Sequence, residues 1–142
     1  FIIGKGSLEN DLKQIVINLK LQDSVKFLGW LSKKKLNKIL YQTQFYLHFS
    51  KVDVIPNSIK EAMYSRCIVL SSKTFAIEEI IDNKKDGFII DPKNINKIVK
   101  TIDFCINNSG SAKLIRDKAR MKIEKNFDIK KNIKFFVKHF SY

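Results

Sequence analysis

The chain has 142 residues, of which 44% are hydrophobic, and it carries a formal net charge of +13 at pH 7. This length and apolar content suffice for one globular domain with a single core and exclude an intrinsically disordered chain. No apolar run approaches the roughly 18 residues that a membrane-spanning helix needs, and the first residues lack a signal-peptide pattern. A cytoplasmic location is the default expectation.

The basic excess is nearly all lysine, because arginine occurs only at positions 66, 116 and 120. Bidentate recognition of phosphate and guanine favours arginine. The lysines are spread along the chain, with local density in residues 33–38 and 113–138, and they do not form a stripe interleaved with aromatic residues. A solvated basic surface is the favoured interpretation, an acidic membrane surface the second, and nucleic-acid binding the least supported.

Cys67 and Cys105 stand in apolar surroundings, without CxxC spacing or a neighbouring histidine cluster. This pattern suits buried thiols in a reducing compartment better than a disulfide or a metal site. No metal is therefore expected.

The first part of the chain alternates between short apolar runs and helical patterns. Residues 1–3 are predicted to be the end of a buried strand whose start is missing, so the chain looks like a piece of something longer. After a glycine turn, a helix is expected over residues 7–19 with Ser7 as its N-cap. Residues 25–28 follow as a short strand ended by Gly29, and Ser32 can cap the next helix.

The same alternation continues through the middle of the chain. Strands are predicted at residues 45–49, 68–70 and 88–90. Between them lie a helical run at 59–63, with Ser58 as its cap, and one short helical turn at 77–81. Strands that alternate with helices indicate parallel βαβ units, so the expected fold is α/β, with a Rossmann-like parallel sheet flanked by helices.

From residue 93 onward the pattern is only helical. Helices are expected over residues 94–106 and 111–125, and a last one after Asp128. Residues 1–142 are expected to form a single incomplete domain, with residues 93–142 as its helical C-terminal part. The last helix is lysine-rich on one side and could touch an anionic membrane, although packing on its own or a partner domain is the more frequent fate.

Residues 50–63, SKVDVIPNSIKEAM, are the most informative segment. Pro56 forbids a helix through its middle, so Asp53 is predicted in a loop and Glu61 in a first helical turn. Both acids follow a buried strand, and open α/β sheets bind ligands at the carboxyl ends of their strands. The alternative is that Asp53 only forms a turn and that Glu61 only complements the helix dipole.

The order FIIGKGSLE, VKFLGWL, FYLHFS, DVIPNSIKEAM, CIVLSS, IEEII and DGFIIDP, followed by ARMKIEKNF, resembles the C-terminal domain of family-four retaining glycosyltransferases of the GT-B fold. The resemblance covers nearly the whole chain. It implies the donor-binding part of an enzyme that transfers a sugar from a nucleotide-diphosphate carrier to an acceptor with retention of configuration. It also implies that the first strand and helix of this domain, and an N-terminal acceptor-binding domain, precede Phe1.

The resemblance also assigns roles to residues. Asp53, where the family more often has glutamate, would be the catalytic carboxylate facing the donor sugar, and Glu61 would accept hydrogen bonds from the ribose. No metal or other cofactor is implied. The donor-binding set is Gly29, Trp30, Leu31, Pro56, Asn57, Ser58, Glu61 and Glu79: the glycine turn at 29–31 would receive the base, and the amides of Asn57 and Ser58 the diphosphate. Trp30 could instead be only an exposed edge of the core.

Three positions depart from the family pattern. Arg66 stands where a glycine commonly ends the helix in left-handed geometry, and Phe75 and Ala76 replace a glycine pair, which would narrow the pocket. These departures keep open a second hypothesis, a truncated or degenerate module that retains the fold without catalysis. A third hypothesis, a basic nucleic-acid-binding domain, predicts strongly salt-dependent binding. The isolated chain is expected to be inactive.

Overall fold

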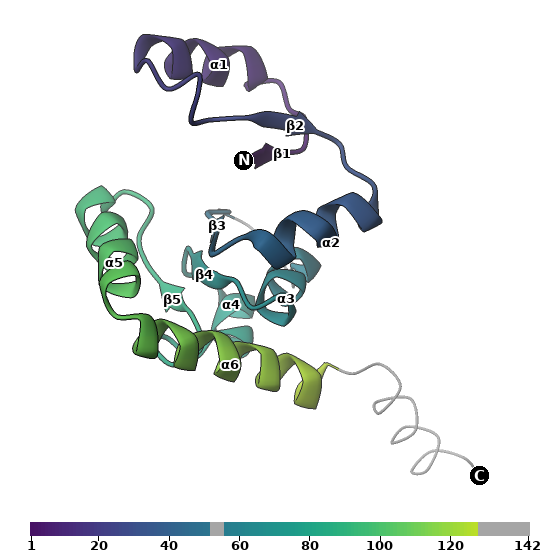
Figure 1. Cartoon of the computed structure of the whole chain (residues 1–142), viewed down its shortest axis with the longest axis vertical. Coiled ribbons are helices and arrows are strands. Elements are labelled where there is room, and N and C mark those ends of the chain that lie inside the picture. The colour runs from purple at the N-terminus through teal and green to yellow at the C-terminus, as the bar shows by residue number, and fades with distance from the viewer. Residues whose placement is uncertain (52–55, 128–142) are drawn as a thin grey trace. The chain divides into compact units, whose positions relative to one another are not determined.

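The computed structural model describes residues 1–51 and 56–127, and these form an α/β chain of short parallel strands flanked by helices (Figure 1). The chain divides into two compact units, Phe1–Lys38 and Ile39–Tyr142. The predicted α/β class and the parallel pairing are confirmed. No helix in the described ranges is long and apolar enough to cross a membrane.

The first unit is a small βαβ arrangement. It contains β1 (Ile2–Ile3), α1 (Glu9–Asn18) and β2 (Phe27–Gly29), and α2 (Lys33–Gln42) runs from it into the second unit. β1 pairs with β2 in parallel. The Ser32 hydroxyl accepts a hydrogen bond from the Lys35 amide at 3.4 Å, so the predicted cap of this helix is confirmed.

No residue of the first unit is buried. Phe1 is 72% exposed, and Ile2 and Ile3 are also exposed, so the expectation of a buried first strand is wrong for the described chain. The physical reason is size, because one helix and two short strands cannot enclose a core. The apolar side chains of this unit remain in contact with solvent.

The second unit is built on a three-stranded parallel sheet in the order β3 (Phe45–His48), β4 (Ile68–Ser71) and β5 (Phe88–Ile89). α3 (Asn57–Tyr64) connects β3 to β4, and α4 (Phe75–Ile80) connects β4 to β5. Phe45 lies opposite Ile68, and Leu70 opposite Phe88. β4 is buried along its whole length, as expected for the central strand of such a sheet.

Two further helices complete the unit. α5 (Ile95–Asn107) and α6 (Ser109–Asn126) are separated by Asn108 alone, a narrower break than the expected 107–110. The side-chain amide of Asn108 donates to the Phe104 carbonyl at 2.9 Å and so satisfies an acceptor at the end of α5. The helix predicted after Asp128 lies outside the described residues.

The core of the second unit lies between the sheet and the last two helices. α6 contacts α3, α5 and β4 (Figure 1). Both cysteines are buried free thiols, as predicted, and burial raises the pKa of Cys67 to about 11. One buried cluster links β4, β5, α5 and α6, and its members are Ile68, Leu70, Phe88, Ile90, Ile98, Cys105, Ala112 and Ile115.

Several predicted helix starts are displaced. α1 begins at Glu9, with Leu8 and not Ser7 as its N-cap, and neither α1 nor α3 has a side-chain cap. α3 begins at Asn57 because Pro56 holds φ at −71° and ψ at 113°, an extended geometry that suits the residue before a helix. Ser58 consequently lies inside the first turn. α4 likewise begins earlier than predicted, directly after the extended Thr74.

Candidate functional site

Hydrogen bonds join the loops that follow β3 and β4. The Ser72 amide donates to the His48 carbonyl at 3.1 Å, and the Ser71 hydroxyl donates to the same carbonyl at 3.0 Å. The Ser72 hydroxyl donates to the Ser50 carbonyl at 2.5 Å. The carboxyl ends of two neighbouring parallel strands are therefore held together at the edge of the sheet where such folds bind ligands.

α3 follows the loop after β3, and the first backbone N–H groups of this helix are free hydrogen-bond donors. In the described ranges, the backbone N–H groups of Asn57 and Ser58 have no hydrogen-bond partner, and no side chain caps the helix. Asn57 is exposed and Ser58 partly exposed. Unsatisfied amides at the positive end of a helix dipole favour an anion.

Glu61 lies on α3, partly buried, but in the second turn and not in the first as predicted. The difference arises because the helix starts at Asn57, two residues before the predicted run. A dipole contribution falls off within the first turn, so the alternative in which Glu61 only complements the dipole loses support. The expected catalytic Asp53 lies outside the described residues.

The loop after β4 adds a group that the sequence reasoning missed. The Thr74 hydroxyl is buried and, within the part of the chain that the structure describes, it has no hydrogen-bond partner. A buried polar group without a partner costs free energy, which a ligand acceptor would recover. The only sequence signal was the polar run SSKT at the end of an apolar strand.

The residues around Thr74 separate into exposed and buried positions. Glu79 is exposed on α4, and Phe75 is 85% exposed at the start of this helix. Ala76, by contrast, belongs to the core, since it is 8% exposed. Of the two replacements for the family's glycine pair, only Phe75 presents a large side chain to solvent.

The expected base-binding turn belongs to the first unit. Gly29 ends β2 with φ at +61°, a left-handed geometry that favours glycine, and its carbonyl accepts the Gly4 amide at 2.8 Å. A hollow of about 310 Å³ is lined in part by Gly4, Lys5 and Trp30. Trp30 is 78% exposed and Leu31 partly buried, so Trp30 is not part of a core within its unit.

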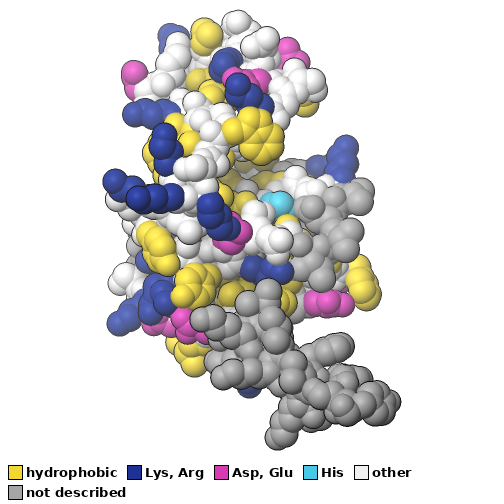
Figure 2. Space-filling view, turned by 90° about the vertical axis from the view of Figure 1, so that its right-hand side faces the viewer, with side chains coloured by type: hydrophobic (Ala, Val, Ile, Leu, Met, Phe, Trp, Pro, Cys, Tyr) yellow, Lys and Arg dark blue, Asp and Glu magenta, His cyan; other side chains and the backbone are white. Residues whose placement is uncertain are grey.

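On one face of the molecule the basic side chains are dispersed (Figure 2). Figure 2 shows Lys and Arg side chains scattered over one face among hydrophobic and acidic ones, not gathered in one stripe. Among the described residues, no group of three or more His, Cys, Asp and Glu side chains is placed to hold a metal ion. His48 lies on β3, partly buried, with its ring stacked on Tyr46 at a centroid distance of 6.2 Å.

Parallel βαβ units with open amides at the carboxyl edge of the sheet define a Rossmann-like α/β domain. Residues 1–126 match the family model described as glycosyl transferases group 1. The chain belongs to this family, and the resemblance to the C-terminal domain of GT-B enzymes is confirmed.

The relatives agree with this assignment. An uncharacterized glycosyltransferase of Haemophilus influenzae is 28% identical over 127 residues, which cover 87% of this chain and 35% of that protein. HepE of Anabaena, crystallised with UDP-glucose, superposes with a TM-score of 0.84 at 21% identity, over 96% of this chain and 38% of its own. The C-terminal domain of LpcC from Francisella tularensis superposes with a TM-score of 0.76 at 22% identity, over 86% of this chain and 63% of its own.

The chain is short beside these proteins. It spans 35%, 36% and 25% of the first curated relatives that it matches, about a third of their length. The family and fold are therefore established for this region.

Proposed function

We propose that this chain is the donor-binding part of a glycosyltransferase that moves a sugar from a nucleotide-diphosphate carrier to an acceptor with retention of anomeric configuration. The observation that carries the proposal is the pair of unpartnered amides of Asn57 and Ser58 at the carboxyl edge of the sheet, in a chain of the glycosyl transferase group 1 family. The UDP-glucose complex of HepE supports a nucleotide sugar as the ligand.

In this proposal different residues bind different parts of the nucleotide sugar. The diphosphate lies at the N-terminus of α3, where free N–H groups and the helix dipole stabilise the negative charge that grows as the diphosphate leaves. Glu61 accepts hydrogen bonds from the ribose hydroxyls. Asp53 faces the sugar, where a carboxylate can accept hydroxyl donors or stabilise positive charge at the anomeric carbon.

Further residues complete the donor site in this proposal. The buried Thr74 hydroxyl donates a hydrogen bond to an oxygen of the nucleotide sugar, because this bond would satisfy a group that has no other partner among the described residues. Glu79 lies on the helix that begins beside it. Gly29, Trp30 and Leu31 form the turn that receives the base. No step requires a metal, since amides and a helix dipole can stabilise the leaving group.

We also propose that this region works within a longer protein. The backbone amides of Ile2 and Gly4 in and after β1 donate toward β2. The backbone carbonyls of Gln44 and His48 at the two ends of β3 accept from the β4 side. Because backbone groups alternate in direction along a strand, those of Ile3 and Leu47 point to the other edge of each strand. Exposed edges of this kind are templates for a further strand. A further strand at either edge, a following helix and an acceptor-binding domain would complete the enzyme, and the isolated chain would be inactive.

Calorimetric titration of the full-length protein with UDP-, GDP- and ADP-sugars tests the donor site. One donor should bind, and Glu61→Ala should weaken it at least about tenfold, the order expected for loss of a hydrogen bond to a charged group. Glu124→Ala, an exposed acid on α6, is the matched control and should leave affinity unchanged. Equal affinity of the Glu61 variant and wild type would remove Glu61 from the donor pocket.

Phe75 favours a second candidate function, that of a module that binds the nucleotide sugar without transferring the sugar. Its ring is exposed, at a position where the family resemblance leads us to expect glycine. Donor binding without any turnover by the full-length protein, together with turnover gained in Phe75→Gly, would favour this function. If wild type transfers sugar, the anomeric signal of the product in a proton NMR spectrum tests retention directly.

A further inference from the structure

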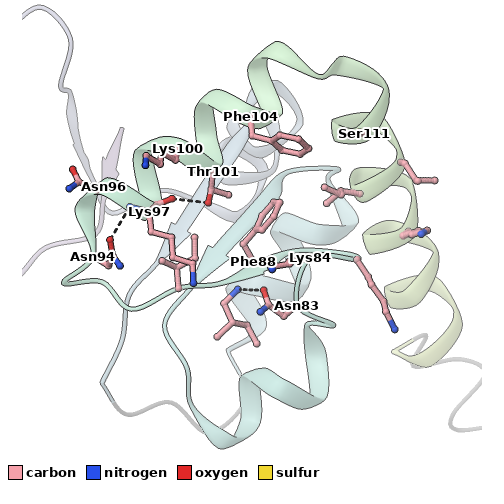
Figure 3. Close-up of a pocket in the computed structure, with 16 residues that line it drawn as sticks. Asn83, Lys84, Phe88, Asn94, Asn96, Lys97, Lys100, Thr101, Phe104 and Ser111 are labelled. Carbon is pink, nitrogen blue, oxygen red and sulfur yellow. Dashed lines mark hydrogen bonds between the residues drawn. The ribbon is translucent and has the colours of Figure 1, made fainter.

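A second cavity lies in the second unit, between β5, the loop before it, α5 and α6 (Figure 3). Its volume is about 690 Å³, within the range of roughly 300 to 1,000 Å³ that is usual for small-molecule sites. All of its lining residues fall between positions 83 and 118, so it shares none with the proposed donor site. It therefore needs an explanation of its own.

The floor of this cavity is apolar and partly open to solvent. Phe88 and Ile115 are buried, whereas Phe104 and Leu114 are 48% and 55% exposed. In Figure 3 the rings of Phe88 on β5 and Phe104 on α5 both point into the space between α5 and α6. Covering exposed apolar side chains in a concave site is favourable, so the floor suits an apolar group.

The rim of this cavity is cationic. Five lysines from one loop and two helices line this rim, and no Asp or Glu does. In the described part of the chain, none of these lysines has an ion-pair partner. They are Lys84 and Lys85 before β5, Lys97 and Lys100 on α5, and Lys118 on α6. Clustered like charges without carboxylates between them create a positive local potential.

Three of the neutral polar side chains of the wall are already engaged. The Asn83 side chain accepts the Ile89 amide at 3.0 Å, and the Asn94 side chain accepts the Lys97 amide at 3.0 Å. The Thr101 hydroxyl donates to the Lys97 carbonyl at 2.8 Å (Figure 3). These bonds fix part of the wall, and the ammonium groups of the rim are the charged donors for a ligand.

We propose that this cavity binds one molecule of an anionic lipid, with a phosphate headgroup among the rim lysines and an acyl chain over Phe88 and Phe104. The apolar floor does not suit inorganic phosphate, and a rim without carboxylates does not favour a zwitterion. A concave space of small-molecule size suits a single lipid better than a helix laid in a long groove. The site would let this region recognise an anionic membrane component.

Calorimetry and native mass spectrometry on the full-length protein test the proposal. The probe is dioctanoyl phosphatidic acid below its critical micelle concentration, compared with dioctanoyl phosphatidylcholine and inorganic phosphate. One molecule of phosphatidic acid should bind per chain, at least about tenfold more tightly than either comparison ligand, because only it matches both floor and rim.

Two variants and a matched control locate the binding. The triple variant Lys84→Gln, Lys97→Gln and Lys118→Gln removes rim charge, and Leu114→Trp fills the cavity from an exposed position. Each should weaken phosphatidic acid at least about tenfold without changing nucleotide-sugar affinity. The control Lys34→Gln, Lys35→Gln and Lys38→Gln removes the same charge from α2 and should bind like wild type.

Several results would overturn the proposal. Equal losses in the rim and control variants would reveal general charge attraction in place of a site. Unchanged affinity in the rim variant, or in a Leu114→Trp protein whose circular dichroism matches wild type, would place the lipid elsewhere. If Leu114→Trp fails to fold, Phe104→Ser gives the same test of the floor. Failure to bind phosphatidic acid, or preference for an acidic amphipathic peptide, would also refute it.

Discussion

At the residue scale, Arg66 shows how far a single position can be predicted. Its φ of +66° confirms the left-handed geometry expected after α3. The Arg66 amide donates to the Met63 carbonyl at 3.1 Å, and the Cys67 amide to the Ala62 carbonyl at 2.9 Å, the two bonds of a Schellman motif. The ion pair of Arg66 with Asp117 could not be predicted, because the two residues are far apart in sequence.

Arg66→Gly and Arg66→Ala form a matched pair. Both remove the ion pair with Asp117, which is exposed and worth little, but only glycine adopts the left-handed geometry without strain. The glycine variant should be more stable than the alanine variant by about 1 kcal/mol in urea denaturation. An alanine variant as stable as the glycine variant would show that this turn is unstrained.

Cys67 gives a second prediction at this scale. Its thiol is buried and donates to the Leu40 carbonyl at 3.3 Å, and burial raises its pKa from 9.0 to about 11. The reactive thiolate is therefore nearly absent at pH 8. Iodoacetamide should label Cys67 only after denaturation, as read by peptide mass spectrometry. Rapid labelling of the native protein at pH 8 would contradict its buried placement.

At the element scale, the alternation of strands and helices was predictable but the helix starts were not. Periodicity marks the apolar face of a helix, whereas its first residue depends on local backbone geometry. Pro56 moved the start of α3 to Asn57, and the extended Thr74 moved the start of α4 to Phe75. The Thr74 hydroxyl was missed for the same reason, because burial of a loop side chain depends on tertiary packing.

Lys122 on α6 should be a main support of the loop before β5. Its ammonium lies 3.1 Å from the carboxylates of both Asp82 and Asp86, and the Asp86 side chain is 5% exposed. Lys122→Met would leave Asp86 buried without its cation, at a cost of about 3 kcal/mol at pH 7. Urea denaturation measures this loss, and Lys113→Met, an exposed change on the same helix, should cost little.

The pH dependence of this effect has a definite sign. Burial raises the pKa of Asp86, and Lys122 opposes this shift, so the pKa should rise further in Lys122→Met. Because the pKa of Asp86 in the folded protein is raised above its value of 3.8 in the unfolded chain, protonated Asp86 stabilises the fold below pH 3.8. This contribution is lost as the pH rises through the pKa of the folded protein. The defect of the variant should therefore shrink at pH 4. A defect of equal size at pH 4 and pH 7 would point to lost packing of the lysine stem.

At the scale of the whole molecule, the fold class and the family were predictable because the order of apolar runs extends over nearly the entire chain. The solvent exposure of the first unit was not, since the apolar pattern of residues 1–3 predicts burial whatever the surroundings. Of the residues proposed for the donor site, Gly29 and Trp30 belong to the first unit, and those on α3 and α4 belong to the second.

Hydrogen–deuterium exchange of the full-length protein, with and without its nucleotide sugar, tests the location of the donor site most directly. Saturating donor should slow exchange in peptides that cover residues 56–62, 72–79 and 29–31, because the ligand would occupy the free amides of α3 and contact the adjoining loops. Unchanged exchange in residues 56–62 at saturation, or protection confined to residues 83–118, would contradict the proposed site.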